Sequence, residues 1–213
     1  MIEAVTIQNF KSLENVELLL GKFNCLVGMN GAGKSTILQA LDLLAQLMHG
    51  NVDQWLAARG WESKDLYCRT SGSRVAGILL AVTIRLEDGQ RLRWTGLMRS
   101  HMRVTSETVY LNGKKILVVL NKICSMPSGS YDITQDYTGS ILASLKESLL
   151  SPELKTLRDT IRNIRSLELL SPHLLRKRSR AQDKDIGAGG EKLSGFLATL
   201  KGEQKAQLLA VLR

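Results

Sequence analysis

The pattern of hydrophobic and polar residues predicts three short β-strands at the start of the chain. Apolar and polar residues alternate over Ile2–Ile7, and two further apolar runs cover Val16–Leu20 and Phe23–Val27. Alternation with a period of two is typical of a strand that buries one face. We therefore expect the third strand to lead directly into the glycine-rich segment that begins at Gly28.

A helix is predicted immediately after that glycine-rich segment. Beyond Ser35, apolar residues recur at spacings of three and four, at Ile37, Leu38, Leu41, Leu44, Ala45 and Met48. This spacing places them on one helical face, and Gly50 is a typical residue for the end of a helix near His49. The order of elements is thus strand, glycine loop, helix.

The segment Val75–Leu120 shows longer alternating runs joined by short turns. Asp88-Gly89 and Asn112-Gly113 each stand between two such runs. These dipeptides favour tight hairpin turns, in which we expect both residues to take a positive φ. We predict an antiparallel sheet of about four strands here.

The remainder of the chain is predicted to be helical after a loop at Ser125–Gly139. Helical spacing is present over Ile141–Leu150, Pro152–Ile164 and Leu193–Leu200. The fold class is therefore α/β, with an antiparallel sheet lobe and a C-terminal helical segment. We expect two parts, residues 1–122 and residues 123–213.

Composition excludes several other classes of protein. The 213 residues are 44% hydrophobic and 23% charged, which argues against disordered, collagen-like and coiled-coil chains. The cysteines Cys25, Cys68 and Cys124 lack metal-site spacing, so we expect them to be reduced in a cytoplasmic protein. The N-terminus lacks signal-peptide features and no run approaches 18 apolar residues, so neither secretion nor a membrane partner is expected.

The net charge of +9 is distributed unevenly. Residues Met1–Ala58 carry three basic and five acidic side chains, whereas Arg59–Lys122 carry twelve and five, and Lys155–Arg180 eight and two. Two basic blocks of this kind indicate a surface that faces a polyanion. An ordinary solvated surface explains them equally well, and both interpretations stay open.

The chemistry-bearing motif is Gly28-Met29-Asn30-Gly31-Ala32-Gly33-Lys34-Ser35, which matches the phosphate-loop pattern G-x-x-x-x-G-K-[ST]. Glycines allow the backbone to curl so that N–H groups converge on phosphate oxygens, and the helix N-terminus adds partial positive charge. Lys34 is expected to neutralise the β- and γ-phosphates, and Ser35 to place its hydroxyl on Mg²⁺. ATP and Mg²⁺ are therefore the expected cofactors.

A second motif, Asn9-Phe10-Lys11-Ser12, precedes this loop by about twenty residues. Together with Asn30–Ser35, it resembles the N-terminal segment of ABC-type ATPases of the SMC, RecF and OLD-like group, within the AAA family. The resemblance implies part of an ATP-binding head, with Lys11 and Ser12 near the nucleotide, and a pairing of two heads or an association with a C-terminal half. The nucleotide-binding residues so implied are Lys11, Ser12, Gly28, Asn30, Gly31, Ala32, Gly33, Lys34, Ser35 and Thr36.

Heads of that group also need a Walker B strand ending in Asp-Glu and an LSGG-like signature, and neither is identifiable in this sequence. The run that ends at Asp88 is interpreted as a strand and its turn, and Lys192–Gly195 as a chance match to part of a signature. Gln135 is a weak candidate for the glutamine that senses the γ-phosphate near Mg²⁺, in competition with an ordinary loop residue. No catalytic residue is assigned, so whether the chain is an ATP hydrolase stays open.

Two functions follow from these observations. The first is an ATP-binding module acting on DNA in repair or phage defence, with DNA held by the basic sheet and by the basic run Arg176–Arg180. In that case hydrolysis needs the missing motifs. The alternative is a non-hydrolysing nucleotide-binding module that docks a partner through its last helix, which carries an apolar stripe at Leu208, Leu209, Val211 and Leu212.

Overall fold

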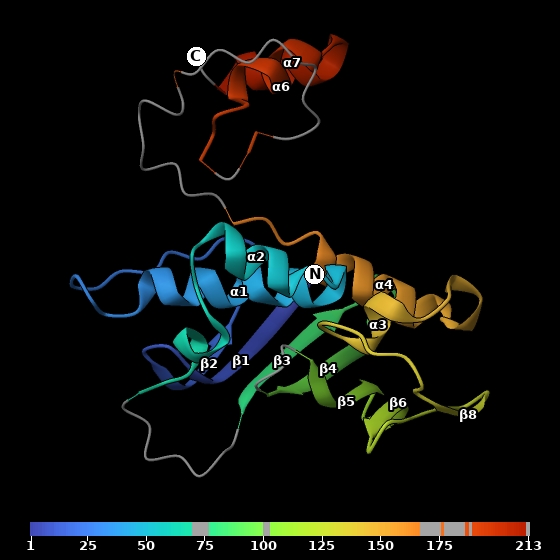
Figure 1. Cartoon of the computed structure of the whole chain (residues 1–213). Coiled ribbons are helices and arrows are strands. Elements are labelled where there is room, and N and C mark those ends of the chain that lie inside the picture. Colours follow the sequence, from blue (N-terminus) through green and yellow to red (C-terminus); the bar gives the residue numbers. More distant parts are fainter. Residues whose placement is uncertain (70–76, 100–102, 167–175, 177–185, 188, 212–213) are drawn as a thin grey trace. The chain divides into compact units, whose positions relative to one another are not determined.

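The computed structural model describes residues 1–69, 77–99, 103–166, 176, 186–187 and 189–211 (Figure 1). Contacts between residues divide the chain into two units, Met1–Ile164 and Arg165–Arg213. Each unit is described by itself.

An antiparallel sheet of eight strands, counted over the described residues, organises the first unit. The strands lie in the order β2-β1-β3-β4-β5-β6-β7-β8, so only β1 and β2 depart from sequence order. The sheet therefore joins the N-terminal segment to the predicted four-stranded region, whose four strands are confirmed. The strand bounds are β1 Ile2–Phe10, β2 Leu13–Leu19, β3 Ile78–Arg85, β4 Arg91–Met98, β5 Val104–Leu111, β6 Lys114–Leu120, β7 Ile123–Met126 and β8 Gly129–Asp132.

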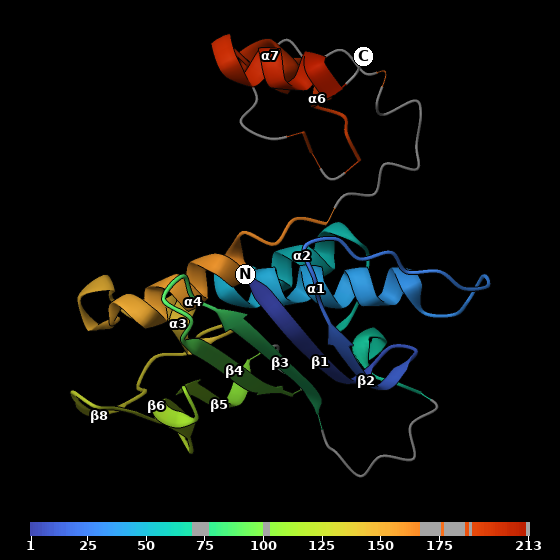
Figure 2. The ribbon, with the colours of Figure 1, turned by 180° about the vertical axis from the view of Figure 1, so that it is seen from behind.

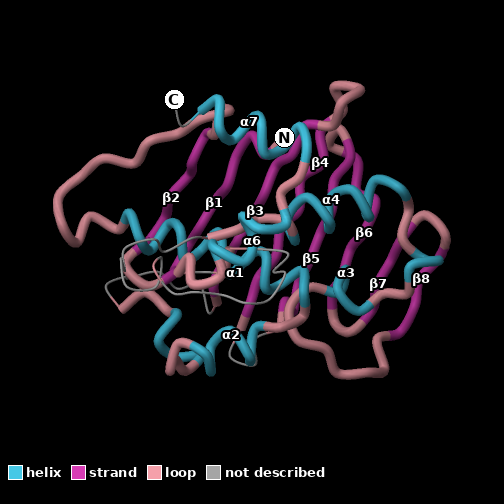
Figure 3. Tube along the Cα trace, turned by 90° about the horizontal axis from the view of Figure 1, so that it is seen from above, coloured by secondary structure: helices cyan, strands magenta, loops and turns pink. Residues whose placement is uncertain are grey.

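One face of this sheet is covered by helices. The helices are α1 (Lys34–His49), α2 (Val52–Ala58), α3 (Ile141–Ser144) and α4 (Pro152–Arg162), with 3₁₀ turns at Ser63–Leu66 and Glu147–Leu149. Figures 1 and 2 show these helices on the same side of the sheet, and Figure 3 shows α1 and α4 running across the strands. Alternate residues of β1 and β4 are buried beneath them, as at Val5 and Trp94, and Val82 on β3 is buried with them. The hydrophobic core therefore lies between this face and the helices.

The helix predicted after the glycine-rich segment is confirmed as α1. It ends at His49, and Gly50 takes a φ of 71° and donates its N–H to Gln46 O. A residue without a Cβ adopts this left-handed conformation at little cost, which is why glycine is common there. The Thr138 hydroxyl donates to Gly50 O, and the Ser140 N–H donates to Leu47 O at 2.9 Å. The loop before α3 is thereby fixed to the C-terminal end of α1.

The two predicted hairpins form, but with different turns. Asn112 and Gly113 have φ values of 48° and 83°, as the prediction required. At the other hairpin only Gly89 has a positive φ, of 84°. Its N–H donates to Leu86 O, and the Leu86 N–H donates to Gln90 O. The prediction for Asp88 was wrong because this loop is a normal β-turn closed by a glycine bulge, which needs one left-handed residue instead of two.

The strand predicted over Phe23–Val27 is absent, since this segment is irregular in the structure. The side chains of Phe23 and Val27 are 87% and 89% exposed. A strand requires a hydrogen-bonded neighbour, and within the described residues β2 is an edge of the sheet with no strand beyond it. The prediction of a strand here was wrong, because the described residues supply this apolar run with no partner strand.

Two further predictions need correction in the segment after β6. The predicted loop Ser125–Gly139 contains the end of β7 and the whole of β8, so the sheet continues beyond the expected boundary at residue 122. The predicted helix over Ile141–Leu150 is broken into α3 and a 3₁₀ turn, with Leu145 in an extended conformation between them. Helix α4, in contrast, begins at Pro152 as predicted, with the Ser151 hydroxyl accepting the Leu154 N–H.

A buried carboxyl group connects the sheet to α3. Glu107 on β5 is fully buried and accepts hydrogen bonds from Trp94 Nε1 at 2.6 Å, from the Ser140 hydroxyl and from the Ile141 N–H at 2.9 Å. Burial raises the pKa of this carboxyl group, because water is no longer present to stabilise the charge. Its three donors offset the cost of burying it and fix the start of α3 on the sheet.

The second unit contributes two described helices, α6 (Leu193–Thr199) and α7 (Gly202–Val211). The first confirms the predicted helix at Leu193–Leu200. No helix in the described ranges is both long enough and apolar enough to cross a membrane.

Candidate nucleotide-binding site

The site begins with the segment Gly28–Ser35, called the glycine loop below, which leads into α1. Gly31 and Gly33 have φ values of 82° and 87°, in the left-handed region that favours glycine. Gly33 is the N-cap of α1, and the Ile37 N–H donates to its carbonyl at 2.9 Å. The N–H groups of the first helical turn therefore have no partner within the helix. A loop of this form is suited to an anion.

Lys34 holds its ammonium group against the backbone of the glycine loop. Its Nζ donates to Gly28 O and to Met29 O, both at 2.7 Å. The positive charge is thus already placed beside the N-terminus of α1. Carbonyl oxygens are neutral acceptors, and phosphate oxygens are anionic, so a phosphate group would compete well for the same amine.

The turn between β1 and β2 packs against the start of α1. Ser12 Oγ donates to Thr36 Oγ1 at 3.1 Å. A Cβ added at Gly33 would lie 3.1 Å from Leu13 Cδ2 and 3.6 Å from Ser12 Oγ. The structure therefore brings Ser12 together with Gly33 and Thr36, although they are more than twenty residues apart in the sequence.

Lys11 occupies the same turn and is the most constrained of the predicted residues. It has a φ of 49°, and its backbone N–H donates to Leu66 O at 2.8 Å. Its Nζ donates to Gln39 Oε1 at 3.0 Å and lies 3.0 Å from the centroid of the Trp61 ring. Burial, assisted by the positive charge of Arg59, lowers the pKa of Lys11 to about 8.

Arg59 is held next to Lys11 by a buried acid on α1. Asp42 accepts hydrogen bonds from Arg59 Nη2 and from Trp55 Nε1, both at 2.7 Å. The Arg59 guanidinium group also lies 5.7 Å from the centroid of the Trp61 ring. Arg59, Gln39 and Trp61 were not predicted as site residues, because no motif links them to Lys11 in the sequence.

The other predicted residues lie in or beside the glycine loop. Asn30, Gly31 and Ala32 are exposed at its tip, and Ser35 is exposed on the first turn of α1. No group of three or more His, Cys, Asp or Glu side chains that could hold a metal ion is found among the described residues. A Mg²⁺ ion here would take Ser35 Oγ with phosphate oxygens and water, which is the donor set that Mg²⁺ commonly uses in nucleotide sites.

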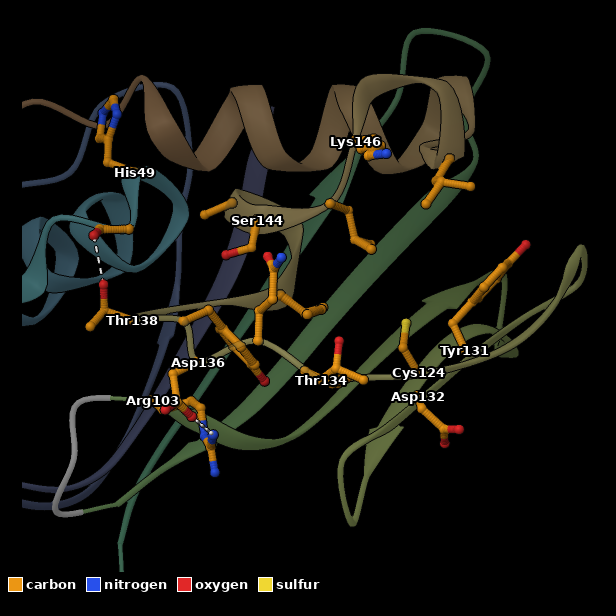
Figure 4. Close-up of a pocket in the computed structure, with 18 residues that line it drawn as sticks. His49, Arg103, Cys124, Tyr131, Asp132, Thr134, Asp136, Thr138, Ser144 and Lys146 are labelled. Atoms are coloured by element: carbon orange, nitrogen blue, oxygen red, sulfur yellow. Dashed lines mark hydrogen bonds and ion pairs between the residues drawn. The ribbon is translucent and has the colours of Figure 1, made fainter.

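Gln135 lies apart from the other predicted residues. It lines a pocket of about 1080 Å³ with His49 and Gly50, at the C-terminal end of α1. Figure 4 shows the pocket between that helix end and the β7–β8 hairpin. The glycine loop is at the N-terminal end of the same 16-residue helix, about 24 Å away at 1.5 Å per residue. The structure therefore does not bring Gln135 to the glycine loop.

The predicted basic residues fall into two groups. Arg85 and Arg91 on the sheet both pair with Glu3, and Arg103 pairs with Asp136 at 3.4 Å. In the run Arg176–Arg180, residues 177–180 lie outside the described residues, and Arg176 is exposed.

Comparison with known proteins finds a family that matches the segment containing the glycine loop. Residues 1–59 match the AAA ATPase domain family. The chain is also 48% identical over 44 residues to an OLD nuclease from Thermus scotoductus (strain ATCC 700910 / SA-01). That match covers 21% of this chain and 8% of the nuclease, so the matched segment corresponds to a small part of that relative. The match to an ATPase family implies the use of a nucleotide.

Some solved structures also resemble the chain at a low level. The recombination mediator RecF bound to ATPrS is 19% identical with a TM-score of 0.36, covering 54% of this chain and 27% of RecF. A structure of SMC ATPases is 20% identical with a TM-score of 0.40, covering 75% of this chain and 98% of that chain. Similarities of this size do not by themselves define the function of the chain.

Proposed function

We propose that the chain is the Mg-ATP-binding module of a RecF/SMC/OLD-like ATPase that acts on DNA in repair or phage defence in the cytoplasm. Hydrolysis then depends on an Asp-Glu pair and a signature sequence supplied from outside these 213 residues, either by a second head or by a C-terminal half.

The observation that carries this proposal is the position of the Lys34 amine within the glycine loop. The amine is 2.7 Å from two loop carbonyl oxygens, next to a helix N-terminus, and two loop glycines have the positive φ that this backbone requires. The family match of residues 1–59 supports it independently.

The residues of this chain have distinct parts in the proposal. The amides at the start of α1 and the Lys34 amine bind and orient the phosphates and neutralise part of their charge. Ser35 offers its hydroxyl to Mg²⁺, and Mg²⁺ supplies further neutralisation of phosphate charge when it is bound. Ser12 fixes Thr36 and hence the first turn of the helix.

A second candidate function is a nucleotide-binding interaction module that does not hydrolyse ATP. The exposed apolar side chains of Phe23, Val27 and Met29 beside the glycine loop favour it, because such a surface is suited to a protein partner.

Calorimetric titration of Mg-ATP into the chain tests the proposal. We expect Lys34→Ala to weaken binding at least tenfold, because it removes a charged hydrogen bond to phosphate. Lys22→Ala is the matched control, since it removes one exposed positive charge from the preceding segment and is expected to leave binding unchanged. Equal affinity of wild type and Lys34→Ala would contradict the proposed role of the glycine loop.

A further inference from the structure

The face of the sheet opposite the helices, called the open face below, carries an ordered set of polar side chains. On β4, Leu92 and Trp94 are buried under the helices, whereas Arg93 between them is exposed. Successive strand residues point to opposite sides, so Arg93 belongs to the open face. The same alternation on β5 places Tyr110 there, next to the buried Val109.

Strand register aligns three of these side chains across the sheet. Arg93 on β4 pairs with Tyr110 on β5, and Tyr110 pairs with Lys115 on β6, beside a register shift between Val109 and Tyr110. Neighbouring strands lie about 5 Å apart, so the backbones of Arg93 and Lys115 are about 10 Å apart, with Tyr110 on the strand between them. These three residues are called the basic strip below.

The next row on the open face is rich in hydroxyl groups. Thr6, Thr95 and Thr108 belong to one continuous cross-strand row, in which Ala81 separates the first two. Thr83 extends the row of the basic strip itself, opposite Arg93. Small hydroxyl side chains leave the surface flat and offer hydrogen bonds to a ligand lying on it.

The charges of the basic strip are not balanced by neighbouring acids. Over the described ranges, neither Arg93 nor Lys115 has an acidic partner within ion-pair distance, whereas Arg85 and Arg91 share the single carboxylate of Glu3. Among side chains near this end of the open face, the basic ones are Arg85, Arg91, Arg93, Lys114 and Lys115, and the acidic ones are Glu3, Glu87 and Asp88. Glu17 on β2 is three strand spacings from β4, or about 14 Å. The positive charge is therefore concentrated over β4–β6.

We propose that the basic strip binds single-stranded nucleic acid. A ring flanked by two free cations matches a polymer in which flat bases alternate with phosphates: a base stacks on Tyr110 while phosphates on either side meet Arg93 and Lys115. The hydroxyl row adds contacts that do not depend on base identity. A duplex hides its base faces and would meet this flat surface only through phosphates, so it would make no use of the ring.

This inference deepens the proposed action on DNA by naming the surface and the form of nucleic acid. It does not involve the glycine loop. In the absence of ATP, Lys34→Ala is therefore expected to bind a single strand as well as wild type does, even though its binding of ATP is weakened. Failure of the basic strip and failure of the nucleotide site are thus distinguishable.

Fluorescence anisotropy with a labelled oligo-dT of about 20 nucleotides tests the inference, with a duplex of the same length in parallel. We expect Tyr110→Leu to weaken single-strand binding about tenfold, because the stacking platform is lost, and Tyr110→Phe to retain it. We expect Arg93→Gln/Lys115→Gln to make the plot of log binding constant against log salt concentration less steep by about 1.4. This change corresponds to the loss of two phosphate contacts on a single strand.

The matched control is Lys201→Gln/Lys205→Gln, which removes the same charge from exposed positions in the second unit. It is expected to leave both affinity and salt slope unchanged, and circular dichroism checks that every variant is folded. The inference is overturned if this control weakens binding as much as the strip variant does. It is also overturned if the chain does not bind oligo-dT at about 50 mM salt, or if the duplex binds as tightly and Tyr110→Leu has no effect.

Discussion

At the scale of single residues, Lys11 is the predicted site residue whose surroundings are most unusual. Its ammonium group lies over the Trp61 ring and donates a hydrogen bond to Gln39, close to the positive charge of Arg59. Both burial and a like charge disfavour the protonated amine, which explains a pKa of about 8 in place of 10.5. The charge of Lys11 therefore depends on pH near pH 8.

If Lys11 contacts the nucleotide, the affinity for Mg-ATP has a corresponding pH dependence. Below pH 8 the amine is charged and attracts phosphate, and above pH 8 it is neutral, so we expect affinity to fall about tenfold between pH 7 and pH 9.5. Lys11→Arg stays charged and should remove most of this dependence. Arg59→Gln should move the midpoint to higher pH, because a like charge is removed. Calorimetry across this pH range measures all three, and an unchanged pH profile in Lys11→Gln would exclude Lys11 as its source.

Sequence and structure differ in a characteristic way at this scale. The loop residues Gly31, Gly33 and Lys34 could be predicted because a phosphate loop is a contiguous motif whose chemistry requires those residue types. The partners of Lys11 could not, because Gln39, Arg59 and Trp61 reach it through the packing of α1 against the turn that follows β1. Gln135 was proposed because it lies in the sequence between the sheet and the later helices. That position in the sequence does not show which end of α1 the loop of Gln135 contacts.

At the scale of elements, α1 connects two distinct sites. Its N-terminus carries the glycine loop, and its C-terminus is held by the loop that leads into α3, through Thr138, Gly139 and Ser140. Gly139 has a φ of 77° and lies so close to α1 that an added Cβ would overlap the Leu47 carbonyl oxygen. The backbones of the loop and the helix thus approach each other at a position that only glycine fits.

A matched pair of glycine substitutions tests this contact. Gly113→Ala retains a positive φ of 83° in open space, so it should lower the free energy of unfolding by about 1 kcal/mol from backbone strain alone. Gly139→Ala adds an overlap with helix backbone, so we expect a loss of about 3 kcal/mol. Urea denaturation followed by tryptophan fluorescence gives both values. Equal losses in the two variants would show that the loop moves away from α1 without cost.

The elements predicted best from the sequence are those that are determined by residues within or next to the element itself. Helices α1 and α4 carry their own caps, Gly50 and Ser151, and the Asn112-Gly113 turn sets the register of its hairpin. The segment Phe23–Val27 has the composition of a strand, but strand formation depends on a neighbour, which periodicity alone cannot supply. The start of α3 likewise depends on a distant residue, since Glu107 on β5 accepts the Ile141 N–H.

At the scale of the whole chain, charge and apolar surface are segregated along the sequence. The first 58 residues hold the glycine loop with more acidic than basic side chains, and the strands β4–β6 carry the free cations. The nucleotide is therefore expected to be held by local dipoles and Lys34, and the positive charge of the sheet remains available for a second polyanion. The three most exposed large apolar side chains of the described residues, in contrast, lie in or just before the glycine loop, at Phe23, Val27 and Met29.

This apolar segment is expected to control self-association of the isolated chain. Phe23, Val27 and Met29 are each at least 85% exposed and close together in the sequence, and exposed apolar surface favours association in water. We expect light scattering of the wild type to show an apparent mass that rises with protein concentration, and Phe23→Ser/Val27→Thr to reduce that rise. Leu209→Ser, at a 48% exposed position on α7, is the control and should not change it. A wild-type chain that stays monomeric at every concentration would show that this segment is covered within the chain itself, and an equal effect of Leu209→Ser would instead place the association surface on the last helix.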